Sequence, residues 1–288
     1  GCDNVYKAAG RTGTSGIVVA PIPVLQKTQI GGKTVAWREA GDGDALVLLH
    51  GIGGNSESWK EQLNQLCDRY RVIAWDMPGY GGSDGFESST PKVDDYSETL
   101  TALLNFLDVK KAHILGQSIA ALVASRFCVR NPDRIKSFLF AHGLTGLGGL
   151  GEEAREKAKR GRIEIFEALG PKRFAREKGP AIMSPSVSES ARETAVGIMA
   201  KVNPAGFRQA VEMLSSANLF EDTASIQVPS LVLCGADDPI APENVCRSVE
   251  VALPDARFCL IPGVGHYSAT EDPAAFNQAL IKFLDSIA

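Results

Sequence analysis

The feature that most constrains the fold of this chain is a series of short runs in which nearly every residue is apolar. The runs cover residues 45–49, 71–75, 112–115, 135–140, 231–234 and 258–261. Unbroken apolar runs, in contrast to alternating ones, are typical of strands that are covered on both faces, as in a parallel sheet. Residues 24–30 and 33–38 flank Gly31-Gly32 and predict a hairpin, the single antiparallel signal in the sequence.

Helical patterns separate the apolar runs. They cover residues 59–67, 96–107, 119–129, 243–251 and 273–287. In the second of these, Leu100, Leu103, Leu104 and Leu107 recur at three- and four-residue steps along one helix face. This alternation predicts an α/β domain with right-handed crossovers. We therefore expect a mostly parallel central sheet of about eight strands with helices on both faces.

Residues 145–222 interrupt the alternation. They contain several helical patterns and no strand-like run, so we expect them to form a helical cap inserted into an α/β core made of residues 23–144 and 223–288. Residues 1–22 are rich in Gly, Ala, Thr and Pro without periodicity, and we expect a flexible N-terminal arm.

The charge balance excludes several kinds of partner. The chain has 30 Lys and Arg against 34 Asp and Glu, with a net charge of −4, which argues against nucleic acid or an anionic membrane surface as a partner. No apolar run approaches the roughly 18 residues of a membrane span, and no signal peptide is recognisable. We expect a cytoplasmic protein, with Gly1-Cys2 as the scar of a lipoprotein cleavage site as the alternative. The sequence does not predict the oligomeric state.

The six cysteines form no C-x-x-C pair, and most of them lie in apolar stretches. We interpret them as free buried thiols in a reducing compartment.

Two segments could hold a nucleophilic serine. Gly81-Gly82-Ser83-Asp84-Gly85 matches the G-x-S-x-G pattern, and Gly116-Gln117-Ser118-Ile119-Ala120 differs from it by one methyl group. The pattern has catalytic meaning only in a sharp strand-to-helix turn. Ser118 follows an apolar run and opens a helical one, whereas Ser83 lies in a loop. We therefore predict Ser118 as the nucleophile and a structural role for Ser83.

A serine nucleophile needs a base, and in this architecture the acid and the histidine follow the serine along the chain. Of the four histidines, His50 and His113 precede Ser118, and His142 closes an apolar run, where a structural role is the commoner one. His266 lies in a glycine-rich loop after the last run and is the predicted base. Asp237 and Asp238 follow residues 231–234 and compete for the role of the acid.

The tetrahedral intermediate of acyl transfer also requires donors for its oxyanion. The backbone N–H of Ile119 follows the nucleophile at a helix N-terminus. The backbone N–H of Ile52 lies among Gly51, Gly53 and Gly54, which allow close approach to a substrate. We predict these two amides as the oxyanion hole.

These motifs, in this order, resemble the α/β-hydrolase fold family over about residues 24–288. The matching segments are residues 49–54, the Asp76-to-Ser83 loop, the turn at Ser118, residues 235–239 and Gly265-His266. The resemblance implies that Ser83 belongs to a structural D-x-P-G-x-G-x-S loop. It also favours Asp238 over Asp237, by the Gly-x-x-Asp spacing. Residues 203–239 are similar to 3-oxoadipate enol-lactonases and related small carboxylesterases.

The resemblance implies a serine hydrolase that cleaves a small carboxylic ester or lactone through an acyl-enzyme, with no metal or organic cofactor. One alternative is hydrolysis of a C–C bond in a ring-fission diketone, although such enzymes usually carry Trp where this chain has Tyr267. The other alternative is a receptor-like protein that binds a ligand with little turnover.

Overall fold

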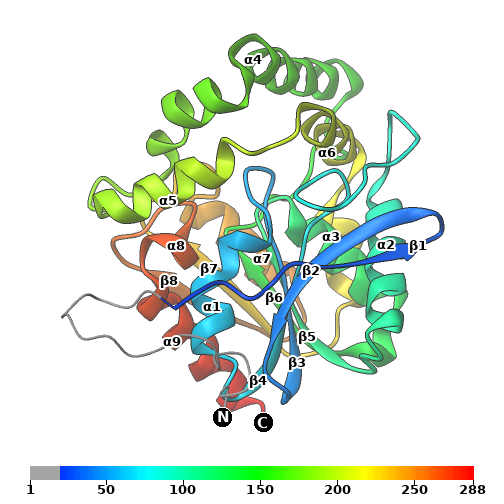
Figure 1. Cartoon of the computed structure of the whole chain (residues 1–288), viewed down its shortest axis with the longest axis vertical. Helices are drawn as coiled ribbons and strands as arrows, with labels where there is room; N and C mark the ends of the chain where they lie inside the picture. Colours follow the sequence, from blue (N-terminus) through cyan, green and yellow to red (C-terminus); the bar gives the residue numbers. More distant parts are fainter. Residues whose placement is uncertain (1–19) are drawn as a thin grey trace.

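The computed structural model describes residues 20–288, which form one eight-stranded sheet surrounded by helices (Figure 1). The strands are β1 (Gln26–Ile30), β2 (Lys33–Ala40), β3 (Asp44–Leu49), β4 (Tyr70–Trp75), β5 (Ala112–Gln117), β6 (Ile135–Ala141), β7 (Ser230–Gly235) and β8 (Ala256–Ile261), in the spatial order β1-β2-β4-β3-β5-β6-β7-β8. The predicted α/β fold with a mostly parallel sheet of eight strands is confirmed.

The hairpin of β1 and β2 is present, but it is not the only antiparallel contact. β2 also runs antiparallel to β4, with Trp37 opposite Trp75. The sequence carried no signal of this second antiparallel pair, because the sequence of a strand does not reveal which neighbour lies on its second edge.

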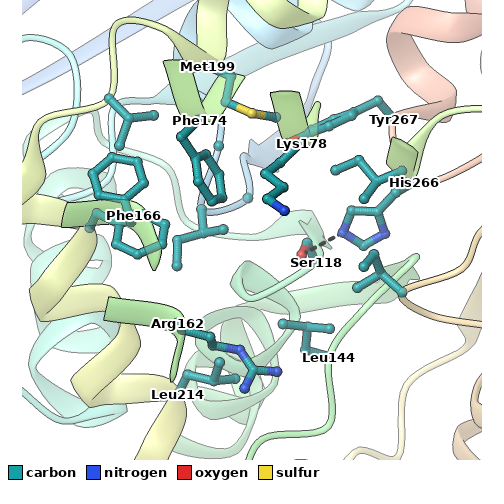
Figure 2. A pocket seen from close by; sticks show the side chains of 17 residues that line it. Ser118, Leu144, Arg162, Phe166, Phe174, Lys178, Met199, Leu214, His266 and Tyr267 are labelled. Atoms are coloured by element: carbon teal, nitrogen blue, oxygen red, sulfur yellow. Dashed lines mark hydrogen bonds between the residues drawn. The ribbon is translucent and has the colours of Figure 1, made fainter. Parts of the chain in front are cut away.

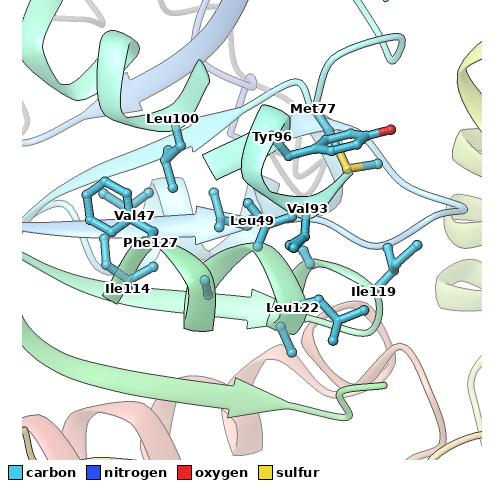
Figure 3. Close-up of a cluster of buried hydrophobic side chains, with 14 of the residues drawn as sticks. Val47, Leu49, Met77, Val93, Tyr96, Leu100, Ile114, Ile119, Leu122 and Phe127 are labelled. Carbon is cyan, nitrogen blue, oxygen red and sulfur yellow. The ribbon is translucent and has the colours of Figure 1, made fainter. Parts of the chain in front are cut away.

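Side chains of the central strands alternate between two hydrophobic layers. Val47 and Leu49 of β3 pack with α2 (Val93–Phe106) and α3 (Ala120–Arg130), as Figure 3 shows. Leu46 and Leu48 face the opposite layer, where α1 (Lys60–Gln65) and α9 (Pro273–Ser286) cover the sheet. Both faces of the strand are buried, which is why its sequence is apolar at successive positions.

The order of the strands reverses at β3. The chain passes from β3 to β4 on one side and later returns to place β5 on the other side. In an open α/β sheet, ligands bind outside the carboxyl ends of the strands at such a reversal. Ile52 follows β3 and Ser118 follows β5, so both predicted site segments meet at this point.

The segment between β6 and β7 is helical, and we call residues 145–222 the insertion. It contains α4 (Glu152–Lys178), a short 3₁₀ turn (Pro180–Ile182), α5 (Glu189–Met199) and α6 (Pro204–Ser216). In Figure 1 these helices lie together at one end of the molecule. Phe166, Phe207 and Leu214 of the insertion belong to the same hydrophobic cluster as the strands. The division into core and cap stays a prediction.

Two further expectations concern the cysteines and the chain ends. Cys128, Cys234, Cys246 and Cys259 are free thiols. Cys67 is disulfide-bonded, so the prediction of a free thiol is wrong at that position. The prediction relied on spacing in the sequence, whereas a disulfide depends on proximity in space. The Gly1-Cys2 site and all but the last three residues of the predicted arm lie outside the described residues.

No helix within residues 20–288 has the length and apolar character needed to cross a membrane.

α7 (Glu243–Ala252) and the one-turn helix α8 (Ser268–Glu271) complete the set of α-helices in this part of the chain.

Candidate active site

Ser118 occupies a sharp turn between β5 and α3. Its φ angle of +55° lies in the left-handed region, which costs a residue other than glycine about 1–3 kcal/mol. A Cβ atom on Gly116 would lie 2.3 Å from the carbonyl oxygen of Ala120, so the turn requires glycine at position 116. The strained turn directs the Ser118 hydroxyl away from the strand and toward the loops at the carboxyl edge of the sheet.

Ser118, His266 and Asp238 form a continuous chain of hydrogen bonds. The Ser118 hydroxyl lies 2.9 Å from His266 Nε2, although 148 residues separate the two in sequence (Figure 2). His266 Nδ1 lies 2.9 Å from Asp238 Oδ2. Because a carboxylate only accepts, Nδ1–H donates to Asp238, which leaves Nε2 free to accept the serine proton. The three side chains are buried, with exposures of 4–5%.

The environment of Asp238 keeps its carboxylate ionised. Burial alone would raise the pKa of Asp238, but the hydrogen bond from His266, the charge of that ring and the Ala241 amide lower it more strongly. The second oxygen, Oδ1, accepts the backbone N–H groups of Ile240 and Ala241 at 2.7 and 3.0 Å. The resulting pKa lies below the ordinary value of an aspartate, so the carboxylate can stabilise a protonated imidazole.

Asp237, the competing carboxylate, points to a different part of the molecule. Its Oδ2 accepts the hydroxyl proton of Ser184 at 2.6 Å, and the residue is exposed. It therefore connects the loop after β7 to the insertion and does not contact His266.

Ser83 has a structural environment. Its hydroxyl donates to the carbonyl oxygen of Asp76 at 2.6 Å and accepts the backbone N–H of Ala36 at 2.9 Å. The Asp76 carboxylate accepts the N–H groups of Ser56 and Gly82. These contacts fasten the loop after β4 to β2. No helix begins directly after Ser83, so this serine lacks the strand-to-helix turn that a nucleophilic serine needs.

The other histidines are buried and satisfied by hydrogen bonds. His50 donates from Nδ1 to the Gly51 carbonyl and accepts the Met77 N–H at Nε2, and burial lowers the pKa of its ring. His142 accepts the Gly235 N–H at Nδ1, which leaves Nε2–H to donate to Ser268. His113 contacts the Ser137 hydroxyl at 2.7 Å, at the opposite end of β5 from Ser118.

The backbone amides of Ile52 and Ile119 have no acceptor among residues 20–288. Ile119 immediately precedes α3, and Ile52 lines the pocket together with Ser118. A Cβ atom on Gly51 would lie 3.0 Å from Ser118 Cβ, so glycine allows the loop to approach the serine. Two unpaired donors beside a hydroxyl are the arrangement that an oxyanion requires.

Ser118 and His266 open into a cavity of about 220 Å³ under the insertion (Figure 2). Most of its wall is apolar, and it includes Phe166, Phe174, Ile182, Met199, Val202, Phe207 and Leu214. Two cations, Arg162 and Lys178, also line it. The sequence did not single these cations out, because both lie on the strongly charged helix α4, where charges usually mark a solvated face.

The loop that carries His266 is fastened by contacts that the sequence analysis also missed. The Glu271 carboxylate accepts the N–H groups of Gly265 and Tyr267 on either side of the histidine, and also that of Ser184 in the insertion. The His266 N–H donates to the Ile182 carbonyl at 2.8 Å. These bonds tie the position of the imidazole to the position of the insertion. A carboxylate five residues after a histidine carries no sequence signal of its own.

Comparisons with known proteins identify the family and the fold. Residues 46–279 match the family described as "Alpha/beta hydrolase family". The dihydrolipoyllysine-residue acetyltransferase component of the acetoin cleaving system of Pseudomonas putida is 30% identical over 268 residues, covering 91% of this chain and 70% of that protein.

Two solved structures are also similar. A thermophilic esterase from Thermogutta terrifontis has a TM-score of 0.81 at 25% identity, covering 92% of this chain and 99% of that one. The enol-lactonase from Burkholderia xenovorans LB400 shares the fold with a TM-score of 0.81 at 20% identity, covering 90% of this chain and 100% of that one.

Proposed function

The chain belongs to the alpha/beta hydrolase family and is an enzyme of that family, and from this premise we propose that it is a serine hydrolase that cleaves a small carboxylic ester or lactone. The observation that carries the proposal is the hydrogen-bonded chain from Ser118 through His266 to Asp238, which ends in the pocket. The cavity of about 220 Å³ is smaller than the roughly 300–1,000 Å³ of drug-sized sites, which supports a small substrate.

In the first half-reaction, Ser118 Oγ attacks the carbonyl carbon while His266 Nε2 accepts the hydroxyl proton. The oxyanion that forms accepts the N–H groups of Ile52 and Ile119. Asp238 holds the tautomer of His266 and stabilises the imidazolium. Collapse of the intermediate breaks the ester C–O bond, His266 returns the proton to the leaving alcohol oxygen, and the acyl group stays on Ser118.

In the second half-reaction, water attacks the acyl-enzyme. His266 Nε2 accepts a proton from the water and then returns it to Ser118 Oγ as the carboxylic acid leaves. When the substrate is a lactone, the alcohol and the acid are two ends of one product.

Labelling with a fluorophosphonate probe tests the nucleophile, because the probe reacts with activated serines. We expect mass spectrometry to find the probe on the peptide that contains Ser118, and Ser118→Ala to abolish labelling. Ser83→Ala is the matched control and should still be labelled. A parent protein that takes up no probe, or takes it up elsewhere, would refute the assignment of Ser118.

A substrate panel separates the proposed reaction from its alternatives. Turnover of short p-nitrophenyl esters or of lactones supports the proposal. Turnover confined to a ring-fission diketone would favour C–C bond hydrolysis, and ligand binding without any turnover would favour a receptor-like role.

A further inference from the structure

Two positive charges face the candidate substrate pocket, and no negative side chain lines it. Arg162 and Lys178 are part of the pocket wall, whereas no Asp or Glu is. Figure 2 shows Lys178 extending toward Ser118 and Arg162 entering from the other side, next to Leu144. The nearby carboxylate of Asp238 is already bound by His266 and two backbone amides.

Both cations line the pocket because α4 is bent. Lys178 follows Arg162 by 16 residues, and on a straight α-helix this spacing would place the side chains roughly 24 Å apart and on nearly opposite faces. The helix changes direction at Gly170, where φ is +73° and ψ is 164°, immediately before Pro171. The bend turns the second half of the helix so that Lys178 reaches the same cavity as Arg162.

Neither cation forms an ion pair with a carboxylate of residues 20–288. The Arg162 guanidinium donates to the carbonyl oxygen of Ala158 at 3.2 Å. The residue is exposed to solvent, and partial desolvation by its surroundings lowers the pKa of the guanidinium from the ordinary value. Lys178 also makes no ion pair within the same range, and its charge adds only a small part to the lowering of the pKa of Glu177, whose ion-pair partner is Arg173. By contrast, Lys159 and Arg173 on the same helix are held by Glu212 and Glu177. Positive charge beside an apolar wall is stabilised when an anion covers it.

We propose that Arg162 and Lys178 bind a carboxylate on the substrate, so that the preferred ester or lactone carries a negative charge in addition to its scissile bond. The proposal rests on the proposed hydrolase function and adds the class of substrate. An Arg fork and a Lys ammonium each suit a carboxylate, which accepts charge-assisted hydrogen bonds from either group. The apolar wall then holds the short carbon chain between the carboxylate and the ester.

Two methyl esters that differ in charge test the proposal. Monomethyl glutarate carries one ester and one carboxylate, and dimethyl glutarate replaces the carboxylate with a neutral ester. We expect kcat/KM to be higher for monomethyl glutarate in the parent enzyme. Arg162→Gln and Lys178→Gln should each lower the ratio of kcat/KM for the charged over the neutral ester by about tenfold, the size of one charge-assisted hydrogen bond.

The matched controls remove the same charges from positions on α4 outside the pocket. Arg160 and Lys172 are exposed, as Arg162 and Lys178 are, but they do not line the cavity. Arg160→Gln and Lys172→Gln should therefore leave the ratio unchanged. The proposal is wrong if the parent enzyme shows no preference for the charged ester. It is equally wrong if all four variants change the ratio alike, because the effect would then come from net charge.

A binding measurement distinguishes failure of this proposal from failure of the hydrolase function. Calorimetric titration of Ser118→Ala protein with glutarate should show binding that Arg162→Gln weakens by about tenfold, whether or not any ester is hydrolysed. Inorganic phosphate should bind more weakly than glutarate, because it lacks the carbon chain that contacts the apolar wall. Equal affinity for the two anions, or no binding of glutarate, would overturn the carboxylate assignment.

Discussion

At the scale of single residues, two adjacent carboxylates have different environments. Asp238 is 5% exposed and bonded to His266, whereas Asp237 is exposed and bonded to the Ser184 hydroxyl. A change of one position in the turn after β7 decides which carboxylate reaches the imidazole. Substitution of Asp237 is therefore a control for substitution of Asp238, because the two aspartates have the same side chain and differ only in position.

Asp238→Asn should lower kcat by about 10⁴-fold, because an amide no longer holds the Nδ1–H tautomer of His266 or stabilises its protonated form. Asp237→Asn removes the negative charge that accepts the Ser184 hydroxyl proton but keeps an acceptor oxygen, and it should keep kcat within about tenfold of the parent. Steady-state kinetics with a short p-nitrophenyl ester measures both, and circular dichroism verifies the fold. Equal losses in the two variants would contradict the assignment of Asp238 as the acid.

At the scale of elements, α4 contains two glycines with opposite requirements. Gly161 lies in a regular part of the helix, and a Cβ atom there would contact nothing within 4 Å. Gly170 also has open space around it, but its φ of +73° with ψ of 164° belongs to a region that only glycine adopts readily. Steric space is thus equal at the two positions, and backbone conformation distinguishes them.

Gly161→Ala should raise the free energy of unfolding by about 0.5–1 kcal/mol, because alanine has the higher helix propensity. Gly170→Ala should lower it by about 1–3 kcal/mol, because alanine is strained in that backbone conformation. Urea unfolding followed by circular dichroism measures both variants. Stabilisation by Gly170→Ala would mean that α4 is straight in solution, and the convergence of Arg162 and Lys178 would then lose its basis.

At the scale of the whole molecule, buried neutral histidines make stability depend on pH. Burial lowers the pKa of His113 to about 4, with a further decrease from Lys136, and burial lowers the pKa of His142 to about 4. An unfolded histidine has a pKa of about 6.5. Between these values the unfolded chain binds more protons than the folded one. The stabilisation is therefore complete above about pH 6.5 and decreases toward pH 4, by up to ~1.4 kcal/mol per pH unit for each histidine.

His113→Gln should make the free energy of unfolding less dependent on pH in this range. Glutamine takes up no proton, and the position lies at the opposite end of β5 from Ser118, so the candidate catalytic groups should be undisturbed. Urea unfolding at a series of pH values from 4 to 7 compares the slopes of the variant and the parent. Parallel curves for the two proteins would show that His113 is not a neutral buried group.

The alternation of apolar runs and amphipathic helices was enough to predict the α/β fold. The spacing of apolar residues along a strand or helix indicates which of its faces is buried, and this spacing can be read locally. Chain order and the strand-to-helix turn likewise led to Ser118 and His266, whose hydroxyl and imidazole the structure brings within 2.9 Å. Their catalytic roles stay a prediction until the labelling experiment is done.

Tertiary structure decided the features that depend on residues distant in sequence. β2 pairs with β4 along its second edge, and Cys67 is disulfide-bonded because of proximity in space. A bend of α4 at Gly170 brings Arg162 and Lys178 to one cavity. Glu271 similarly fastens the histidine loop to the insertion. Local sequence sets which face of an element is buried, but the partners across a loop or a bend are chosen by the packing of the whole chain.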